Sequence, residues 1–162
     1  MTRVAAFDNK DGVARGGGSG EESSIGAEVD TAIRNWGIRE MGGITRKMAT
    51  GRYLIITDES HVELAKKKRF EIIDTVREIK NENRVSATVS MGVGRGASDI
   101  AVSEEWARQA LDMALGRGGD QVAIKNKDDS FEFFGGLSKG VEKRDKVRTR
   151  VIAAAISDQC VN

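Results

Sequence analysis

Hydrophobic and polar positions follow two different periods along the chain, and the changes between them mark the expected elements. An apolar run over residues 3–7, ending at an Asp-Asn pair, predicts a buried first strand. Within residues 25–36, apolar side chains recur at i, i+4, i+8 and i+11, which predicts an amphipathic helix. Residues 42–57 form two strand-like halves around a central glycine, and this pattern predicts a β-hairpin.

The second half of the chain continues this alternation of helices and strands. The elements expected there are a helical stretch from residue 58 that is clearest at 69–80, a strand at 84–94, a helix capped by Ser103 and stopped by Gly116, and short strands at 121–125 and 130–136. The charged-then-apolar pattern of residues 139–160 predicts a last helix. Strands separated by helices predict an α/β (α+β) fold, a mixed sheet flanked by helices.

Composition narrows the class of protein without identifying a function. The 162 residues suffice for one domain, and 26 basic against 25 acidic side chains give no general attraction to nucleic acid. No apolar run reaches the roughly 20 residues of a membrane helix, and the first residues lack a signal-peptide core. A single cysteine, Cys160, excludes an internal disulfide and fits a reducing cytosol, so a cytoplasmic domain is expected.

Several motifs imitate binding sites. The glycine-rich stretch at 14–24 lacks the Lys-Ser/Thr of a phosphate-binding loop and is interpreted as a connector. A Gly92-x-Gly94-x-x-Ala97 match to a dinucleotide fingerprint is rejected, because the following helix starts too late. His61 has no Cys or His partner nearby and is expected at the surface rather than on a metal. The basic run at 66–69 fits a solvated helix face better than a nucleic-acid patch.

The triplet Gly118-Gly119-Asp120 permits two interpretations, a phosphate and metal site or a tight turn. It follows the long helix and precedes an apolar run, "QVAIK". Neither a second acid nor an aromatic residue follows the aspartate. The turn is therefore the preferred interpretation.

Three stretches together resemble one known family. They are "ATVSMGVGRG", "ARQALDMALGRGGDQVAIK" and "FFGGLSKGVEKRDKVRTRVIAAAISD". The chain resembles the degenerate GGDEF domain of cyclic-di-AMP phosphodiesterases of the GdpP/YybT type. The resemblance implies a nucleotidyl-cyclase-like mixed sheet over residues 1–138, followed by a linker helix at 139–162. It also implies neighbouring PAS and DHH/DHHA1 domains and a parent protein anchored in the bacterial plasma membrane.

The resemblance also places the positions at which active GGDEF domains bind metal and phosphate. The motif falls on the hairpin residues Ala49, Thr50, Gly51, Arg52 and Tyr53. Gly51 and Arg52 stand where the two acids of the motif belong, and Ala6 stands where the first strand supplies a metal ligand. The resemblance therefore implies no diguanylate cyclase activity, no catalytic residue and no bound metal, because an arginine opposes Mg²⁺ binding.

Three functions remain open at this point. The first is a noncatalytic regulatory module, with the helix expected at 139–160 as a mechanical relay. The second is a domain that binds ATP weakly, with Mg²⁺, and hydrolyses it slowly; Asp8, Asn9 and Arg52 are its nucleotide-binding candidates, since a guanidinium pairs well with phosphate. Arg52 as an exposed hairpin residue and Asp8 as a turn cap are the structural alternatives. The third is a homodimerisation module, whose candidate surface is the apolar stripe Val147, Val151, Ile152, Ala155 and Ile156.

Overall fold

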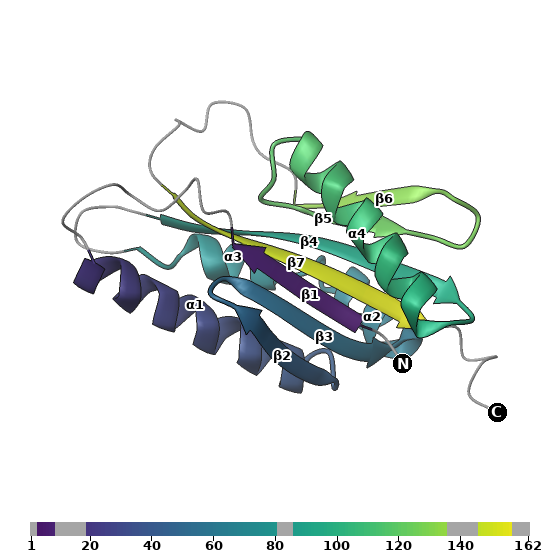
Figure 1. The fold of residues 1–162 in the computed structure, drawn as a ribbon, viewed down its shortest axis with the longest axis horizontal. Coiled ribbons are helices and arrows are strands. Elements are labelled where there is room, and N and C mark those ends of the chain that lie inside the picture. The colour runs from purple at the N-terminus through teal and green to yellow at the C-terminus, as the bar shows by residue number, and fades with distance from the viewer. Residues whose placement is uncertain (1–2, 9–18, 81–85, 136–145, 157–162) are drawn as a thin grey trace.

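The fold is a mixed β-sheet with helices on both faces (Figure 1). The computed structural model describes residues 3–8, 19–80, 86–135 and 146–156. Along the chain the elements are β1 (Arg3–Asp8), α1 (Ser19–Arg39), β2 (Ile44–Ala49), β3 (Arg52–Asp58), α2 (Glu59–Lys67), α3 (Ile72–Arg77), β4 (Ser86–Ala97), α4 (Ile100–Gly116), β5 (Val122–Lys125), β6 (Phe131–Phe134) and β7 (Lys146–Ile156). The predicted α/β class with a mixed sheet is confirmed.

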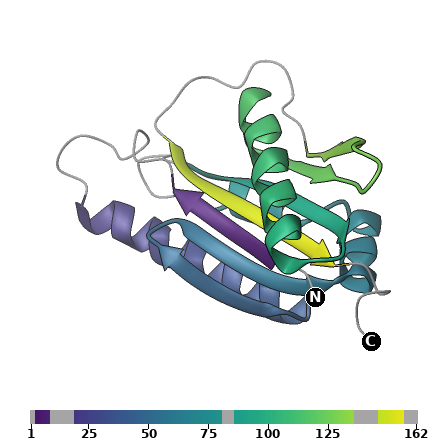
Figure 2. The same cartoon turned by 45° about the vertical axis from the view of Figure 1, so that its right-hand side comes forward.

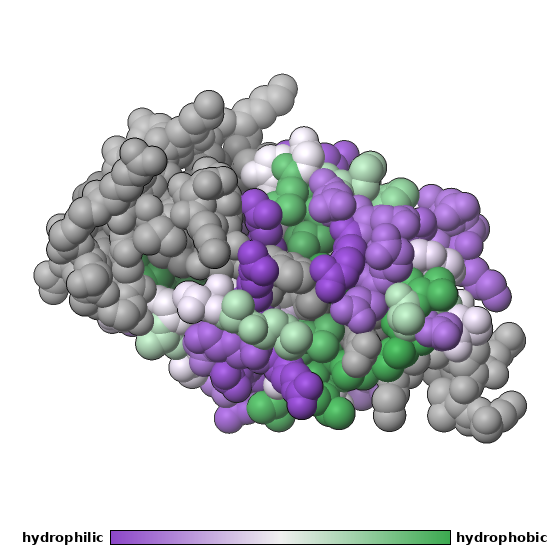
Figure 3. All heavy atoms as spheres, viewed as in Figure 1, coloured by the Kyte–Doolittle hydropathy of each residue, from purple (hydrophilic) through white to green (hydrophobic). Residues whose placement is uncertain are grey.

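The strands are ordered β2-β3-β7-β4-β5-β6, and β1 pairs antiparallel with β7 outside this path. β7 runs parallel to both β3 and β4, while β2 and β6 are antiparallel to their neighbours. The helices α1, α2 and α3 lie on one face of the sheet, and α4 crosses the other (Figures 1 and 2). The α4 face carries many polar side chains, with hydrophobic ones visible toward its lower edge (Figure 3).

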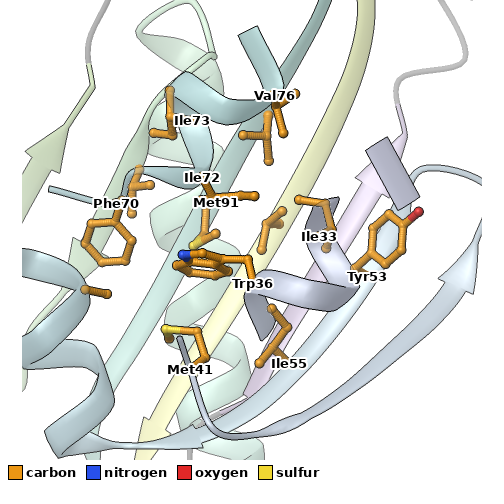
Figure 4. Close-up of a cluster of buried hydrophobic side chains, with 14 of the residues drawn as sticks. Ile33, Trp36, Met41, Tyr53, Ile55, Phe70, Ile72, Ile73, Val76 and Met91 are labelled. Atoms are coloured by element: carbon orange, nitrogen blue, oxygen red, sulfur yellow. The ribbon is translucent and has the colours of Figure 1, made fainter. Parts of the chain in front are cut away.

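The main core fills the space between the sheet and the first three helices (Figure 4). The predicted apolar stripe of α1 contributes to it directly, because Ile33 and Trp36 point at the strands. Tyr53 and Ile55 face them from β3, and Met91 from β4. The apolar face of the helices, which repeats every 3.6 residues, therefore packs on the apolar face of the strands, which repeats every two. This shared layer supplies most of the hydrophobic stabilisation.

The expected helix over residues 139–160 is wrong where the structure describes this segment. Lys146–Ile156 forms β7, which is hydrogen-bonded between β3 and β4. Alternating Val147, Thr149 and Val151 fit a strand as well as a helix, and pairing on both edges decides the outcome over local helix propensity. The segment thus belongs to the sheet and cannot serve as a helical relay over these residues.

The proposed dimerisation stripe is wrong for the same reason. Of its members with described side chains, Val151 is fully buried in the main core and Ile152 is buried against α4. A strand paired on both edges offers no free surface to a second copy, so a homodimer through this stripe would require opening the sheet.

The helical stretch expected from residue 58 divides into α2 and α3. Between them, Arg69 and Phe70 adopt positive φ values of 54° and 50°. Phe70 is nevertheless fully buried, with its ring 6.3 Å from that of Trp36 and 5.2 Å from that of Phe134. Burial of this aromatic ring compensates for a backbone conformation that costs roughly 1–2 kcal/mol per residue. The basic run at 66–69 therefore spans a helix end and a turn: Lys67, Lys68 and Arg69 are exposed, as expected for a solvated face, but only Lys66 and Lys67 lie on the helix.

The long helix α4 begins earlier than its predicted cap. Asp99 is the N-cap, and its side chain accepts a hydrogen bond from the backbone N–H of Ala101 at 2.6 Å. Ser103 is fully buried inside the helix, and its hydroxyl donates to the carbonyl of Gly94 on β4 at 3.2 Å. Aspartate and serine are equally good N-caps, so the sequence pattern allowed both starts and packing against β4 selects Asp99.

Asp58 is the last residue of β3 and the N-cap of α2. Its hydrogen bonds in this position shift the pKa of its carboxyl group. Its carboxylate accepts hydrogen bonds from the Ser60 hydroxyl at 2.6 Å and from the backbone N–H of His61 at 3.0 Å. The ring Nδ1 of His61 lies 2.8 Å away. Burial by itself raises the pKa of Asp58, but the bonds from Ser60 and His61 outweigh it and lower the pKa to about 2.

This lowered pKa gives a stability contribution that is present above the ordinary carboxyl value and disappears as pH falls from about 4 toward 2. In Asp58→Asn the amide oxygen retains the cap but has no such titration. We expect the wild-type advantage over Asp58→Asn in urea unfolding to shrink between pH 5 and pH 2. Asp112→Asn, on the exposed face of α4, controls for the loss of one carboxylate. An advantage that stayed constant over this range would contradict the assignment.

Candidate functional site

The predicted hairpin motif forms a tight turn at the edge of the sheet. β2 ends at Ala49 and β3 begins at Arg52, which pair directly across the turn residues Thr50 and Gly51. Gly51 has a φ of +68°, a conformation that glycine adopts without the steric cost of a side chain. The β-hairpin prediction is confirmed, and Ala49, Thr50, Gly51, Arg52 and Tyr53 form its turn and the strand ends beside it.

Tyr53 fastens this hairpin to α1. The side chain of Tyr53 is 1% exposed, and its hydroxyl donates a hydrogen bond to the carboxylate of Asp30. The same carboxylate accepts from Arg34 at 2.8 Å and lies 3.4 Å from the ammonium group of Lys47. Burial raises the pKa of Asp30, but the bonds from Tyr53 and Arg34 and the charge of Lys47 outweigh it, so the pKa is lowered. The ionised Asp30 carboxylate, bonded to Tyr53 and close to Lys47, therefore holds the hairpin against the helix.

Asp30 is a residue that the sequence analysis did not select. It lies within the helix predicted for residues 25–36, beside the apolar stripe and one position after the buried Val29. A polar residue at the margin of an apolar stripe, with a tyrosine in the neighbouring hairpin, is the only signal the sequence offers for this contact.

Two arginines occupy paired backbone positions at the base of the turn. Arg52 lies opposite Arg150 of β7 in the parallel register, and both side chains are half-buried. Paired residues of neighbouring strands project to the same face, so two guanidinium groups share one region of the α4 face. The Nε of Arg150 is buried and has no hydrogen-bond partner among the described residues. This region therefore presents two basic side chains, and the turn beside it offers no carboxylate ligand for a metal cation.

The first strand, β1, places Asp8 at the same end of the sheet as the two arginines. Asp8 lies opposite Thr149 of β7, one register position from the pair formed by Arg150 with Arg52. Ala6 lies opposite Val151. The backbone positions of Asp8 and Arg52 therefore lie at the same end of β7, on β1 and β3 respectively. Asn9 lies outside the described residues.

The hairpin residues do not fit a divalent cation. Mg²⁺ requires oxygen ligands, and the motif offers a glycine and an arginine where acids would stand. Within residues 19–80, 86–135 and the described strands beside them, no group of three His, Cys, Asp or Glu side chains is arranged to hold a metal ion. His61 is half-buried and bonded to Asp58.

The triplet Gly118-Gly119-Asp120 is a structural turn, as predicted. All three residues have positive φ values of 106°, 71° and 56°. The Asp120 carboxylate is buried and accepts a hydrogen bond from Nε of Arg77 at 2.9 Å. Arg77 also donates to the carbonyls of Asp120 at 3.1 Å and Gly135 at 2.5 Å. The turn therefore joins α3 to the segments that flank β5 and β6, a role that the sequence analysis did not assign to Arg77.

The two glycines of the rejected dinucleotide fingerprint also have a packing role. A Cβ on Gly92 would collide with the backbone of Ala107 and Leu111, and one on Gly94 with the backbone of Ser103 and Ala107. Both glycines therefore allow α4 to lie directly on β4. Close helix packing explains the glycines, as it does in many sheet proteins.

Comparison with known proteins agrees with this geometry. The family model "Cyclic-di-AMP phosphodiesterase GdpP-like, GGDEF domain" matches residues 5–132. The chain is 33% identical over 155 residues to the cyclic-di-AMP phosphodiesterase PdeA of Listeria monocytogenes, and 34% identical over 152 residues to the cyclic-di-AMP phosphodiesterase GdpP of Bacillus subtilis. These matches cover 96% and 94% of the chain but only 23% of each relative. No solved structure matches significantly.

None of the described helices combines the length and apolar composition that crossing a bilayer requires. The chain spans about a quarter of the length of the relatives it matches, so those proteins contain further regions beside the part that resembles it. Since the family model covers most of the sequence, the chain belongs to the GdpP-like family of cyclic-di-AMP phosphodiesterase GGDEF domains.

Proposed function

We propose that the chain is a noncatalytic regulatory domain of a membrane-anchored cyclic-di-AMP phosphodiesterase and has no diguanylate cyclase activity. The observation that carries the proposal is the pair Arg52 and Arg150 at the base of a hairpin whose turn, Ala49 to Tyr53, contains no acidic residue. Two neighbouring guanidinium groups repel a divalent cation, and nucleotidyl transfer depends on such cations to neutralise the phosphates.

A regulatory role is supported by the position of β7 rather than by a helical relay. β7 pairs with β1, β3 and β4, so a displacement of this strand changes the backbone that supports the hairpin. In this proposal, neighbouring PAS and DHH/DHHA1 domains are coupled through the sheet. Coupling between these domains then requires a structural element that can adopt two positions and that both domains influence. We propose β7 as this element.

The test separates cyclase chemistry from regulation. The purified chain, incubated with GTP and Mg²⁺ or Mn²⁺, is expected to form no cyclic dinucleotide detectable by chromatography. The Bacillus subtilis relative with its corresponding domain replaced by this chain should hydrolyse cyclic-di-AMP, and Arg52→Ala or Arg150→Ala should change that rate severalfold. Cyclic-di-GMP formation would overturn the first part, and a rate that neither variant alters would overturn the second.

A second candidate function, weak ATP binding, is favoured by the same two arginines. Their guanidinium groups suit the oxygens of a triphosphate, and the backbone of Asp8 lies one register position away along β7. Titration calorimetry with ATP, with and without Mg²⁺, tests this candidate. Binding that Arg52→Ala weakens at least tenfold would support it. If ATP turnover were unchanged in Arg52→Ala and Asp8→Ala, the hypothesis that Asp8, Asn9 and Arg52 bind nucleotide would be dropped.

A further inference from the structure

β7 carries more backbone pairings than the two edges of one strand can complete. Its residues 150–154 are paired in parallel with β3 and β4 and in antiparallel register with β1. Ala154, for example, has backbone partners in Arg3, Ile56 and Gly94. Each residue has one N–H and one C=O, and successive residues direct these groups to opposite edges of a strand. The three ladders therefore draw on groups that suffice for two.

The strand with which β1 competes is β3. In both views of the fold, β1 lies along the boundary between β3 and β7 (Figures 1 and 2). β4 pairs with β7 on the opposite edge, so it is not displaced by β1. Directly paired strands lie about 4.8 Å apart, which leaves no room for a third strand between them. A complete β1–β7 ladder and a complete β3–β7 ladder therefore exclude each other.

The composition of β1 suits an inner position in the sheet. Its residues 4–7 are all apolar, without the alternation of a strand that has one face in solvent. Continuous apolar runs are typical of strands that are covered on both faces. Residues 151–156 of β7 form a run of the same kind, and β7 is an inner strand of the sheet. The sequence of β1 is therefore that of a strand able to pair on both edges.

The register is also suitable for pairing between β1 and β3. Phe7 and Arg52 are both partners of Arg150, just as Arg3 and Ile56 are both partners of Ala154. The two strands run in opposite directions, because β1 is antiparallel and β3 parallel to β7. A strand inserted at their boundary would thus meet β3 in a continuous antiparallel register.

We propose that β1 is an exchangeable strand that inserts between β3 and β7. In the released arrangement β3 and β7 pair directly, and in the inserted arrangement β1 pairs with both. Insertion separates β3 from β7 by two strand spacings, about 9.6 Å, and places the backbone of Phe7 between Arg52 and Arg150. β7 thereby takes two positions relative to β3. The regulatory meaning of this movement rests on the proposed function, whereas the strand exchange itself does not.

Disulfide cross-linking distinguishes the two arrangements, because a disulfide requires Cα atoms within about 7 Å of each other. The full chain carries Arg3→Cys, Ile56→Cys and Ala154→Cys, with Cys160→Ser to remove the only other thiol. In the released arrangement, a bond between positions 56 and 154 is expected. In the inserted arrangement position 3 lies between them and can be joined to either, while positions 56 and 154 are too far apart.

After equilibration in a glutathione redox buffer, mass spectrometry of proteolytic peptides measures the share of each disulfide. We expect both the bond between 56 and 154 and bonds from position 3, including the one to 56. Ala5→Pro removes a backbone donor from β1 and is incompatible with an inner strand, so it should raise the share of the bond between 56 and 154 at least threefold. Ala5→Val is the matched control, which keeps the donor and should not lower the share of bonds from position 3.

Three cross-linking results would overturn the proposal. If positions 3 and 56 were never joined in any variant, β1 would not lie between β3 and β7. If positions 56 and 154 were not joined even in Ala5→Pro, β3 and β7 would have no direct pairing to lose. If Ala5→Pro left the shares unchanged, β1 would not compete with β3.

Hydrogen exchange of the unmodified chain decides the question if the cysteine variants fail to fold. The amides of β1 should exchange at least tenfold faster than those of β4 and at least tenfold slower than those of the exposed residues 127 and 128. Protection of β1 equal to that of β4 would show a permanent strand, and protection no greater than that of the exposed residues would show a strand that never pairs. Either result contradicts exchange. Both methods report strand positions rather than activity, so they can fail while the regulatory role holds.

Discussion

Replacing Gly92 with alanine is expected to lower the free energy of unfolding by about 3 kcal/mol, the upper range for overpacking a core. The added Cβ would meet the carbonyl oxygen of Ala107 and the backbone nitrogen of Leu111. Neither atom belongs to a flexible side chain, so α4 itself would have to move away from β4. That movement would also separate Ala107 and Leu111 from Leu54 and Ile152, with which they form a buried cluster.

Urea unfolding monitored by circular dichroism measures this loss. Gly116→Ala is the matched control, because Gly116 is the last residue of α4 and a Cβ there meets nothing within 4 Å. Its free energy of unfolding should stay the same or rise by up to about 1 kcal/mol, since alanine is the better helix former. If Gly92→Ala cost no more than Gly116→Ala, close packing of α4 on this glycine would be refuted.

Removing the guanidinium of Arg77 should have an effect of similar size, about 3 kcal/mol. The side chain of Asp120 is 7% exposed, and Arg77→Ala would deprive it of an ionic partner in that buried place. The variant would also remove the donors to the carbonyls of Asp120 and Gly135. We expect an intermediate loss for Arg77→Lys, because an ammonium group keeps the charge but cannot reproduce the geometry of the guanidinium.

Chemical denaturation of the variants tests the prediction. Arg108→Ala is the control, because Arg108 forms an ion pair with Glu104 on an exposed helix face, and such pairs contribute less than about 1 kcal/mol. Equal losses for Arg77→Ala and Arg108→Ala would show that the contact with Asp120 is not a major source of stability. Full stability in Arg77→Lys would show that charge alone suffices.

The sequence predicted those parts of the fold that follow from a local pattern. The stripe from Ile25 to Trp36 gave α1, and the glycine between two alternating segments gave the β2–β3 hairpin. β4, α4, β5 and β6 lie within a few residues of their expected positions. In each case one face of the element is apolar with a clear period, and that face is buried.

The misassigned elements depended on contacts distant in sequence. The pattern of residues 146–156 fits a strand and a helix equally, and only pairing with β3 and β4 decides. No glycine or proline marks the break at Arg69 and Phe70, which the burial of Phe70 enforces. At the candidate site, the resemblance located Arg52, but Arg150 became visible only through strand register.

The central place of β7 has a consequence for biosynthesis. Its pairings with β3 and β4 join residues such as Arg52 and Ser90 to Arg150, far along the chain. While the ribosome has delivered only the residues before β7, β3 and β4 each lack the neighbour that will pair with their inner edges, and such open edges invite association between nascent chains. Pairing between strands that lie far apart in sequence is also slow. Translation pauses or chaperone contact before Lys146 would therefore matter more for this domain than for one whose central strand is synthesised first.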